Sequence, residues 1–366
     1  MKTIVVSAVN IRRGGTLRIL RDCLSYLSGL ASEGNYRVVA IVHDKSLALY
    51  RNVEYIEIPG TVGSWSKRLW CEYVTMNKIS AEFAPVYLWF SLHDTTPRVK
   101  AERQAAYFQT SFPFMKLKRR DWQFDYKIGL FGLFTRFAYR VNIRRNRFIV
   151  VQAEWLRRGF SQMFDIAPTT FIVAPPEESP ADFLPAVPDD GIFRFAYVCG
   201  PDCHKNIELL CEASRKLESI VGPRSFCVNL TVNGTENRYA GWLRDNWGNV
   251  KSINFLGYLS REDVNKCYSE ADCLVFPSRI ETWGLPISEF RQSGKPMLLA
   301  DLPYAHEAAA GSDKAAFFNV DDSDELMQLM LRLVKGDQTF LNPVVHPAHK
   351  APYANTWQQV FDYLLN

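Results

Sequence analysis

Apolar runs alternate with helical patterns along nearly the whole chain of 366 residues. Short runs rich in Val, Ile, Leu and Phe are typical of parallel strands that are buried on both faces of a sheet. Segments with an apolar residue every three or four positions follow these runs, as expected for the helices that cover such a sheet. The alternation predicts an α/β protein. With 47% hydrophobic and 22% charged residues and no internal repeat, disordered, collagen-like and solenoid folds are excluded.

The first half of the chain predicts one complete α/β domain, at residues 1–174. An initial strand leads into a loop that carries Gly14 and Gly15, and a helix with one leucine-rich face follows. We expect further strands where short apolar runs recur. The predicted strands are Thr3–Val9, Arg37–His43, Val53–Ile58, Val86–Leu92 and Phe148–Gln152.

A segment rich in proline and acidic residues interrupts the alternation at 175–191, and such a segment is typical of a linker between domains. The alternation then begins again and predicts a second domain at 192–351, as expected for a chain of this length. The strands predicted there are Phe193–Cys199, Phe226–Val232, Ile253–Leu256, Cys273–Phe276 and Pro296–Ala300. The helices predicted there are Asn206–Ile220, Arg261–Ala271 and one that starts at Pro286.

The positive charge is concentrated in one segment. The net charge of the chain is +4, yet ten basic and two acidic residues lie between Phe114 and Arg147. Aromatic residues alternate with these cations at helical spacing, and Arg136, Arg140 and Arg144 are expected on one helix face. The pattern of cations and aromatic residues at 116–147 therefore favours an amphipathic helix that lies at an anionic membrane surface. The alternative is a helix that docks on the first domain and exposes a solvated basic face.

Several classes of protein are excluded by what the sequence lacks. No window reaches the ~20 apolar residues of a transmembrane helix, and Met1–Val6 is better interpreted as a first strand than as a signal peptide, so we expect a cytoplasmic protein. The eight cysteines are irregularly spaced and indicate reduced core residues. Cys199, Cys203 and His204 lack the second pair of ligands that a zinc site needs. We expect no metal, no cofactor and no nucleic-acid partner.

The most informative segment runs from Phe276 to Glu289. A buried strand is expected to end at Pro277, and Gly284 allows the sharp turn that precedes a helix. The free N–H groups at that helix start suit a diphosphate. The two carboxylates, Glu281 and Glu289, suit a ligand rich in hydroxyl groups. The alternative is a capped helix with a stabilising glutamate in its first turn.

This segment closely resembles the E-x7-E motif of glycosyltransferase family four, the glycosyl transferases group 1. The chain departs from the family at Thr282-Trp283, where Gly-Phe is usual, and at 290–292, where Ala-Met-Ala is usual. The residues kept in register are Pro277, Ser278, Glu281, Gly284, Leu285, Pro286, Glu289, Gly294 and Pro296. The resemblance implies the GT-B fold, in which two Rossmann-like domains face each other across a cleft. It also implies that 352–366, which open with a Tyr-Ala-Asn-Thr-Trp start, form a helix that crosses back onto the N-terminal domain.

The resemblance assigns roles in binding a nucleotide sugar. Lys205 takes the diphosphate, although Gly200-Pro201-Asp202 replaces the arginine that the family usually carries nearby. Tyr258, after Phe255-Leu256-Gly257, lies at the base, and a plain turn is the alternative there. The donor-binding set is Gly14, Gly15, Lys205, Tyr258, Glu281, Gly284, Leu285 and Glu289, and the catalytic set is His93, Glu281 and Lys205. The alternatives are that His93 is a structural histidine at a strand end and that Lys205 is a solvated surface lysine.

The function implied is transfer of a sugar, with retained anomeric configuration and without metal, from a nucleotide-diphosphate sugar to an acceptor hydroxyl. Relatives of this kind act in bacterial capsule or lipopolysaccharide assembly, so we expect a lipid-linked saccharide acceptor and a peripheral position on the inner face of the plasma membrane. Rival hypotheses are an epimerase or phosphorylase of similar fold, and an inactive scaffold that binds sugar nucleotides at the membrane.

Overall fold

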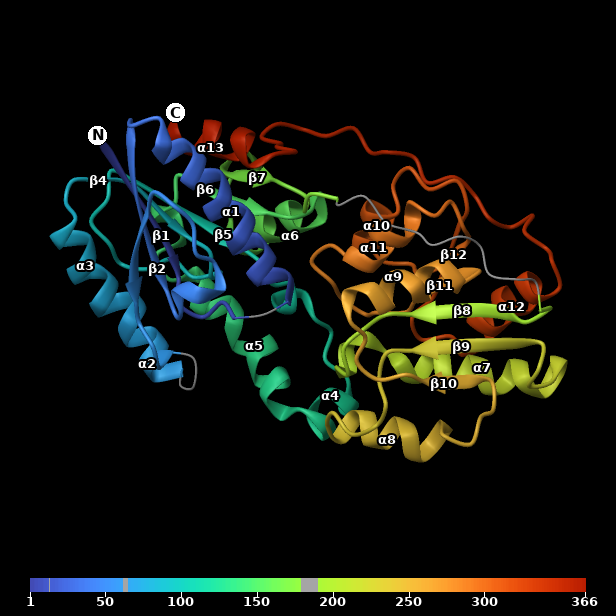
Figure 1. Ribbon diagram of the computed structural model, residues 1–366. Helices are drawn as coiled ribbons and strands as arrows, with labels where there is room; N and C mark the ends of the chain where they lie inside the picture. Colours follow the sequence, from blue (N-terminus) through green and yellow to red (C-terminus); the bar gives the residue numbers. More distant parts are fainter. Residues whose placement is uncertain (13, 62–64, 179–189) are drawn as a thin grey trace. The chain divides into compact units, whose positions relative to one another are not determined.

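The computed structural model describes residues 1–12, 14–61, 65–178 and 190–366. These form two compact units, each with one parallel sheet covered by helices (Figure 1). Unit 1 contains Met1–Pro113, Leu133–Glu177 and His349–Asn366, and unit 2 contains Phe114–Gly132 and Glu178–Ala348. Most of the predicted linker at 175–191 lies outside the described residues.

The sheet of unit 1 has seven strands in the order β3-β2-β1-β4-β5-β6-β7. All neighbouring strands run parallel, and the order reverses between β1 and β4, as in a doubly wound Rossmann-like sheet. The strands are β1 Lys2–Ala8, β2 Tyr36–Val42, β3 Val53–Glu57, β4 Val86–Ser91, β5 Arg103–Phe108, β6 Phe148–Val151 and β7 Phe171–Val173. Its helices include α1 Gly14–Ser32, α2 Trp65–Trp70, α3 Met76–Glu82, α6 Glu154–Phe164 and α13 Trp357–Leu365.

The sheet of unit 2 has six parallel strands in the order β10-β9-β8-β11-β12-β13. The strands are β8 Phe193–Tyr197, β9 Phe226–Leu230, β10 Ile253–Phe255, β11 Cys273–Phe276, β12 Met297–Ala300 and β13 Ala315–Phe318. The helices are α4 Arg119–Phe124, α7 Ile207–Val221, α8 Arg238–Trp247, α9 Arg261–Glu270, α10 Leu285–Arg291, α11 Pro303–Ala308 and α12 Ser323–Val334. Helix α5 Tyr126–Arg140 begins in unit 2 and ends in unit 1.

The prediction of two Rossmann-like α/β sheets is confirmed. Every predicted strand is present, with its ends shifted by no more than two residues. Three strands were not predicted, namely β5, β7 and β13. Strand β5 begins with Arg103-Gln104 and continues with two alanines, so it lacks a β-branched run. Strand β7 has only three residues, too few to establish a pattern.

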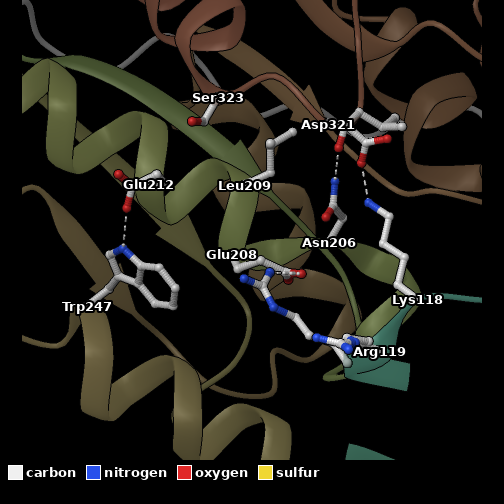
Figure 2. Close-up of a pocket in the computed structure, with 11 residues that line it drawn as sticks. Lys118, Arg119, Asn206, Glu208, Leu209, Glu212, Trp247, Asp321 and Ser323 are labelled. Atoms are coloured by element: carbon white, nitrogen blue, oxygen red, sulfur yellow. Dashed lines mark hydrogen bonds and ion pairs between the residues drawn. The ribbon is translucent and has the colours of Figure 1, made fainter. Parts of the chain in front are cut away.

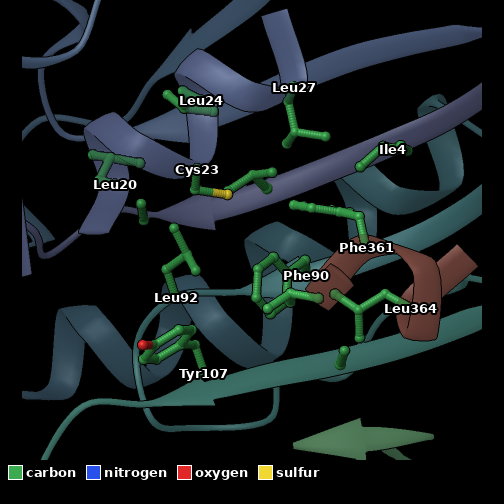
Figure 3. Packing of buried hydrophobic residues seen from close by; sticks show 14 of the residues in the cluster. Ile4, Leu20, Cys23, Leu24, Leu27, Phe90, Leu92, Tyr107, Phe361 and Leu364 are labelled. Carbon is green, nitrogen blue, oxygen red and sulfur yellow. The ribbon is translucent and has the colours of Figure 1, made fainter. Parts of the chain in front are cut away.

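The C-terminal helix α13 completes the core of unit 1, as predicted from the resemblance. Phe361 and Leu364 are buried in the same cluster as Ile4 and Phe90 (Figure 3). The Tyr87 hydroxyl donates a hydrogen bond to the Leu365 carbonyl at 2.6 Å. The last helix therefore packs on the fold formed by the start of the chain, because its apolar face is part of the buried core of unit 1.

The helix predicted to carry Arg136, Arg140 and Arg144 on one face is shorter than expected. Helix α5 ends at Arg140, and Asn142 adopts the left-handed conformation with φ of 60°. Asparagine tolerates this conformation and commonly ends helices there. Arg144 lies in the following 3-10 turn and donates a hydrogen bond to the Asp165 carbonyl at 2.9 Å. The prediction of a three-arginine face is wrong at its third member.

Candidate functional site

The loop between β11 and α10 is shaped by Pro277 and Gly284. Pro277 ends the strand because it has no N–H to donate to the sheet. Gly284 has φ of 98°, and a Cβ there would lie 3.2 Å from Ile287 Cδ1 and 3.4 Å from a ring carbon of Tyr304. Only glycine fits both the conformation and the space. Helix α10 begins at the next residue, one position earlier than predicted.

Lys205 and Glu281, which were assigned to the site separately, form one ion pair. Their Nζ and Oε1 atoms are 2.6 Å apart, and their side chains are 17% and 15% exposed. Burial alone would lower the pKa of Lys205, but the charge of Glu281 and its hydrogen bond raise that pKa above its usual value. The ammonium therefore stays charged and partly accessible, which suits an anionic ligand.

Hydrogen bonds fasten the loop after β11 to the 3-10 turn Cys203–Lys205. The backbone N–H of Arg279 donates to the His204 carbonyl at 2.8 Å, and the Asn206 amide donates to the Pro277 carbonyl at 3.2 Å. Two tyrosine hydroxyls also donate hydrogen bonds to these segments. Tyr197 donates to the Lys205 carbonyl at 2.8 Å, and Tyr304 donates to the Ser278 carbonyl at 2.6 Å. The loop is thus held in place before any ligand binds.

Glu289 pairs with a cation that the sequence analysis missed. Its Oε1 lies 2.7 Å from a guanidinium nitrogen of Arg261, at the start of α9. The glutamate side chain is 16% exposed, and the arginine side chain is 52% exposed. No spacing rule connects two residues 28 positions apart in different elements, so only the fold reveals this pair.

The turn after β10 has the geometry expected of a loop that presents its backbone. Gly257 has φ of 79°, and a Cβ there would lie 3.0 Å from the Asn233 side-chain nitrogen. Tyr258 follows and is 92% exposed, so its ring is available to a planar ligand.

In unit 1, the predicted residues lie at the ends of β1 and β4. Gly14 and Gly15 are exposed at the start of α1, and a Cβ at Gly14 would meet no atom within 4 Å. His93 is only 1% exposed. Its Nε2 lies 3.0 Å from the Ser7 hydroxyl and its Nδ1 lies 3.1 Å from the Thr95 hydroxyl. Both ring nitrogens are therefore engaged within unit 1, and contact with a sugar would require one to change partner.

The buried groups around His93 have shifted pKa values. Burial lowers the pKa of His93, against the opposing charge of Glu72, so its ring is neutral near pH 7. Burial also raises the pKa of Asp94 to about 6, although the Gln109 N–H and the Arg68 guanidinium oppose this shift. Asp94 adopts φ of 57° directly after His93. Asp94 was not among the site residues predicted from the sequence, although an acidic residue at a strand end is a recognisable feature.

A cavity of about 500 Å³ opens beside the start of α7 (Figure 2). Basic residues of α4 line one side and acidic residues of α7 line another. Trp247 Nε1 donates to Glu212 at 3.3 Å, and Lys118 pairs with Asp321. The lining residues are Lys118, Arg119, Arg120, Asn206, Glu208, Leu209, Glu212, Trp247, Val320, Asp321 and Ser323. Asn206 connects this cavity with the loop after β11, because it follows Lys205 and binds the Pro277 carbonyl.

A metal site would need several cysteine, histidine or acidic side chains grouped together. All eight cysteines are free thiols, and six of them are buried. In the described part of the chain, no group of three or more His, Cys, Asp or Glu side chains is arranged to hold a metal ion. Over the same residues, no helix is both long and apolar enough to cross a membrane.

The chain has two doubly wound parallel sheets, and its last helix packs on unit 1. These features define a protein of the GT-B fold. Solved structures of this fold superpose on nearly the whole chain. The apo form of the lipopolysaccharide outer core galactosyltransferase WaaB gives a TM-score of 0.65 at 10% identity, with 92% of this chain and 91% of that chain covered. Anabaena Alr3699/HepE in complex with UDP-glucose gives a TM-score of 0.65 at 13% identity, with 93% and 92% covered.

Residues 193–336, which include the E-x7-E segment, match the family model of the glycosyl transferases group 1. The resemblance inferred from the E-x7-E segment is thereby confirmed. Among curated proteins, the O-antigen chain mannosyltransferase RfbU of Salmonella typhimurium is 22% identical over 193 residues. That match covers 52% of this chain and 52% of RfbU, so it spans about half the length of this relative.

Proposed function

We propose that the chain is a retaining glycosyltransferase that moves a sugar from a nucleotide-diphosphate sugar to an acceptor hydroxyl in the assembly of a bacterial surface polysaccharide. The observation that carries this proposal is the Lys205–Glu281 pair, held 2.6 Å apart at the end of β11. It places a charged ammonium and a carboxylate at one point of a preformed loop. That combination suits the diphosphate and the hydroxyl groups of one ligand.

In this proposal each residue of unit 2 has one task. Lys205 exchanges part of its interaction with Glu281 for the diphosphate, and the Leu285 amide at the start of α10 adds a neutral donor. Glu281 then accepts hydrogen bonds from sugar hydroxyls, and Glu289 accepts from the ribose. Tyr258 contacts the base. The assignments of Gly14, Gly15 and His93 to the same donor stay predictions of the resemblance.

The reaction would not need a metal. The bond between the sugar C1 and the diphosphate oxygen breaks while the acceptor oxygen bonds to C1 on the same face. The acceptor proton passes to the leaving diphosphate. Lys205 and the Leu285 amide stabilise the charge that develops on the leaving group, a task for which fixed donors are well suited. The neighbours support the donor class, since HepE binds UDP-glucose.

We further propose that the acceptor is lipid-linked and is met at an anionic membrane surface, on the inner face of the plasma membrane. Helix α5 supports this, because most of its large apolar side chains are exposed, whereas Thr135 and Tyr139 are buried. Arg136 lies beside this face with its guanidinium 4.7 Å from the Phe137 ring. The exposed apolar residues of α5 are Tyr126, Leu130, Leu133, Phe134 and Phe137, and Val141 directly after the helix is exposed as well. A helix docked by its apolar face would show the opposite pattern.

Hydrolysis of the donor without acceptor separates the enzyme from the inactive scaffold. A transferase slowly releases nucleoside diphosphate from its own donor, because water replaces the acceptor. Wild-type protein incubated with the UDP-, GDP- or dTDP-sugar that it binds should release product, and Glu281→Gln should release far less. Tight binding with no release from any of the three donor classes would favour the scaffold.

A further inference from the structure

Residues 114–132, which we call the strap, leave the first half of the sequence and fold into unit 2. The strap is rich in cations, yet its Asp121 is only 1% exposed. A buried carboxylate needs a partner, because an isolated buried charge is costly. The partner is Arg279, whose guanidinium binds both carboxylate oxygens, one of them at 3.1 Å from Nη1. The side chains of Arg279 and Asp121 are 7% and 0% exposed.

Arg279 contacts both segments that carry the candidate site. It stands two residues before Glu281, and its backbone N–H holds the His204 carbonyl directly before Lys205. Its guanidinium also donates to the Cys203 carbonyl at 3.2 Å and to the Lys116 carbonyl of the strap at 3.3 Å. One side chain thus ties together the loop of Glu281, the turn of Lys205 and the strap.

Other contacts keep the strap seated. The Phe124 ring packs against Tyr239 and Trp242, with ring centroids 5.6 Å and 5.3 Å apart. Arg120 pairs with Glu208 at 2.7 Å, in the first turn of α7. The Asp121 carboxylate also accepts from the Lys118 backbone N–H at 2.7 Å and so caps α4. Asp121 is therefore held by a hydrogen bond at the start of its own helix as well as by Arg279.

We propose that Asp121 and Arg279 are positioning residues for the nucleotide-sugar site, and that the strap serves as a support of the donor loop. This inference rests on the proposed function, because it assigns a purpose to the geometry of Lys205 and Glu281. A buried ion pair contributes little net stability compared with an apolar pair, whereas loss of one partner leaves the other charge unpaired. The pair fixes the loop in one arrangement.

The test compares Asp121→Asn with wild type. Asparagine keeps the volume and an oxygen that can cap α4, but it loses the charge that holds Arg279. The control is Asp337→Asn, which removes a carboxylate from the exposed pair with Arg332 in the same unit. We measure affinity for the nucleoside diphosphate that wild type binds best and for the same nucleoside without phosphate. We also measure amide hydrogen exchange over residues 277–284 without ligand.

For Asp121→Asn we expect roughly ten- to hundredfold weaker binding of the diphosphate and an unchanged affinity for the bare nucleoside, because a loop that supports the phosphate-binding groups has shifted. Amide exchange over 277–284 should become faster. Asp337→Asn should change neither. A folded Asp121→Asn protein with wild-type diphosphate affinity and wild-type exchange would overturn the inference.

A second variant and the behaviour of wild type separate failure of this inference from misfolding and from failure of the proposed function. If Asp121→Asn does not fold, Arg279→Lys replaces it, since lysine keeps the charge but not the two-point contact. The same loss of diphosphate affinity is then expected, and its absence would overturn the inference. If wild type itself binds no nucleotide, the proposed function fails first. If wild type binds and the variants bind equally well, only the inference about the strap fails.

Discussion

At the scale of single residues, Glu289 offers the cleanest test of the donor assignments. Its partner Arg261 is half exposed, so their pair contributes little to stability. Glu289→Ala should therefore fold normally but bind nucleoside diphosphate about tenfold more weakly, because a charged acceptor for the ribose is lost. Isothermal titration checks this, with Glu270→Ala in α9 as control. Wild-type affinity in Glu289→Ala would disprove the assignment.

Lys205 is predicted to act on the phosphates alone. Lys205→Ala should cost on the order of 1.5–3 kcal/mol in affinity for the diphosphate, as is typical of a charge-assisted hydrogen bond. Affinity for the bare nucleoside should stay the same. The comparison of the two ligands by titration is the measurement, and an equal loss with both would show that the lysine holds the loop rather than the ligand.

Asp94 predicts a dependence of stability on pH. Its folded pKa, raised to about 6 by burial, lies above the usual value, so the proton favours the folded state. Stability is therefore lost as pH rises from about 4 to about 6, and the cost is complete above that window. Asp94→Asn should stabilise unit 1 by about 1–3 kcal/mol at pH 7.5 and by almost nothing at pH 4. Thermal unfolding at both pH values tests this, and an equal gain at both would contradict it.

At the scale of elements, the start of α10 depends on Gly284. An alanine there suffers both an unfavourable φ and contacts with Ile287 and Tyr304. Gly294 also has positive φ, at 67°, but a Cβ there would meet nothing within 4 Å. Gly294→Ala should thus cost about 1–2 kcal/mol, from the backbone alone. Gly284→Ala should lower the melting temperature further, and equal losses would show that the space around Gly284 is not limiting.

Helix α5 carries the prediction of membrane binding. Reversal of Arg136 and Arg140 to Glu should abolish co-sedimentation with anionic liposomes at low salt, since each cation contributes about 1 kcal/mol at such a surface. Phe134→Ser with Phe137→Ser should weaken it as well. The control is Arg98→Glu with Lys100→Glu, a matched charge change at exposed positions of unit 1. Wild-type protein that ignores anionic vesicles even at low salt would leave α5 without this role.

The elements themselves show what the sequence can and cannot predict. Strands such as β11, apolar at every position, were predicted to the residue, because burial on both faces leaves an unmistakable run. The α10 start followed from Gly284 and Pro286, since both have special backbone geometry. The pairing of Arg261 with Glu289 and of Asp121 with Arg279 could not be predicted from the sequence. Each pairs with a residue far away in sequence, and only the assembled sheet brings them together.

At the scale of the whole molecule, we propose that the loop after β11 and the turn of Lys205 form a donor site for a nucleotide sugar. The most direct measurement is a thermal-shift screen of UDP-, GDP- and dTDP-sugars against wild type, Lys205→Ala and Glu289→Ala. We expect one donor class to stabilise wild type, by about 2.7 kcal/mol at 100 times its Kd. Both variants should need markedly more of the same donor for an equal shift. A wild type stabilised by none of the three, or variants that respond exactly as wild type does, would contradict the claim.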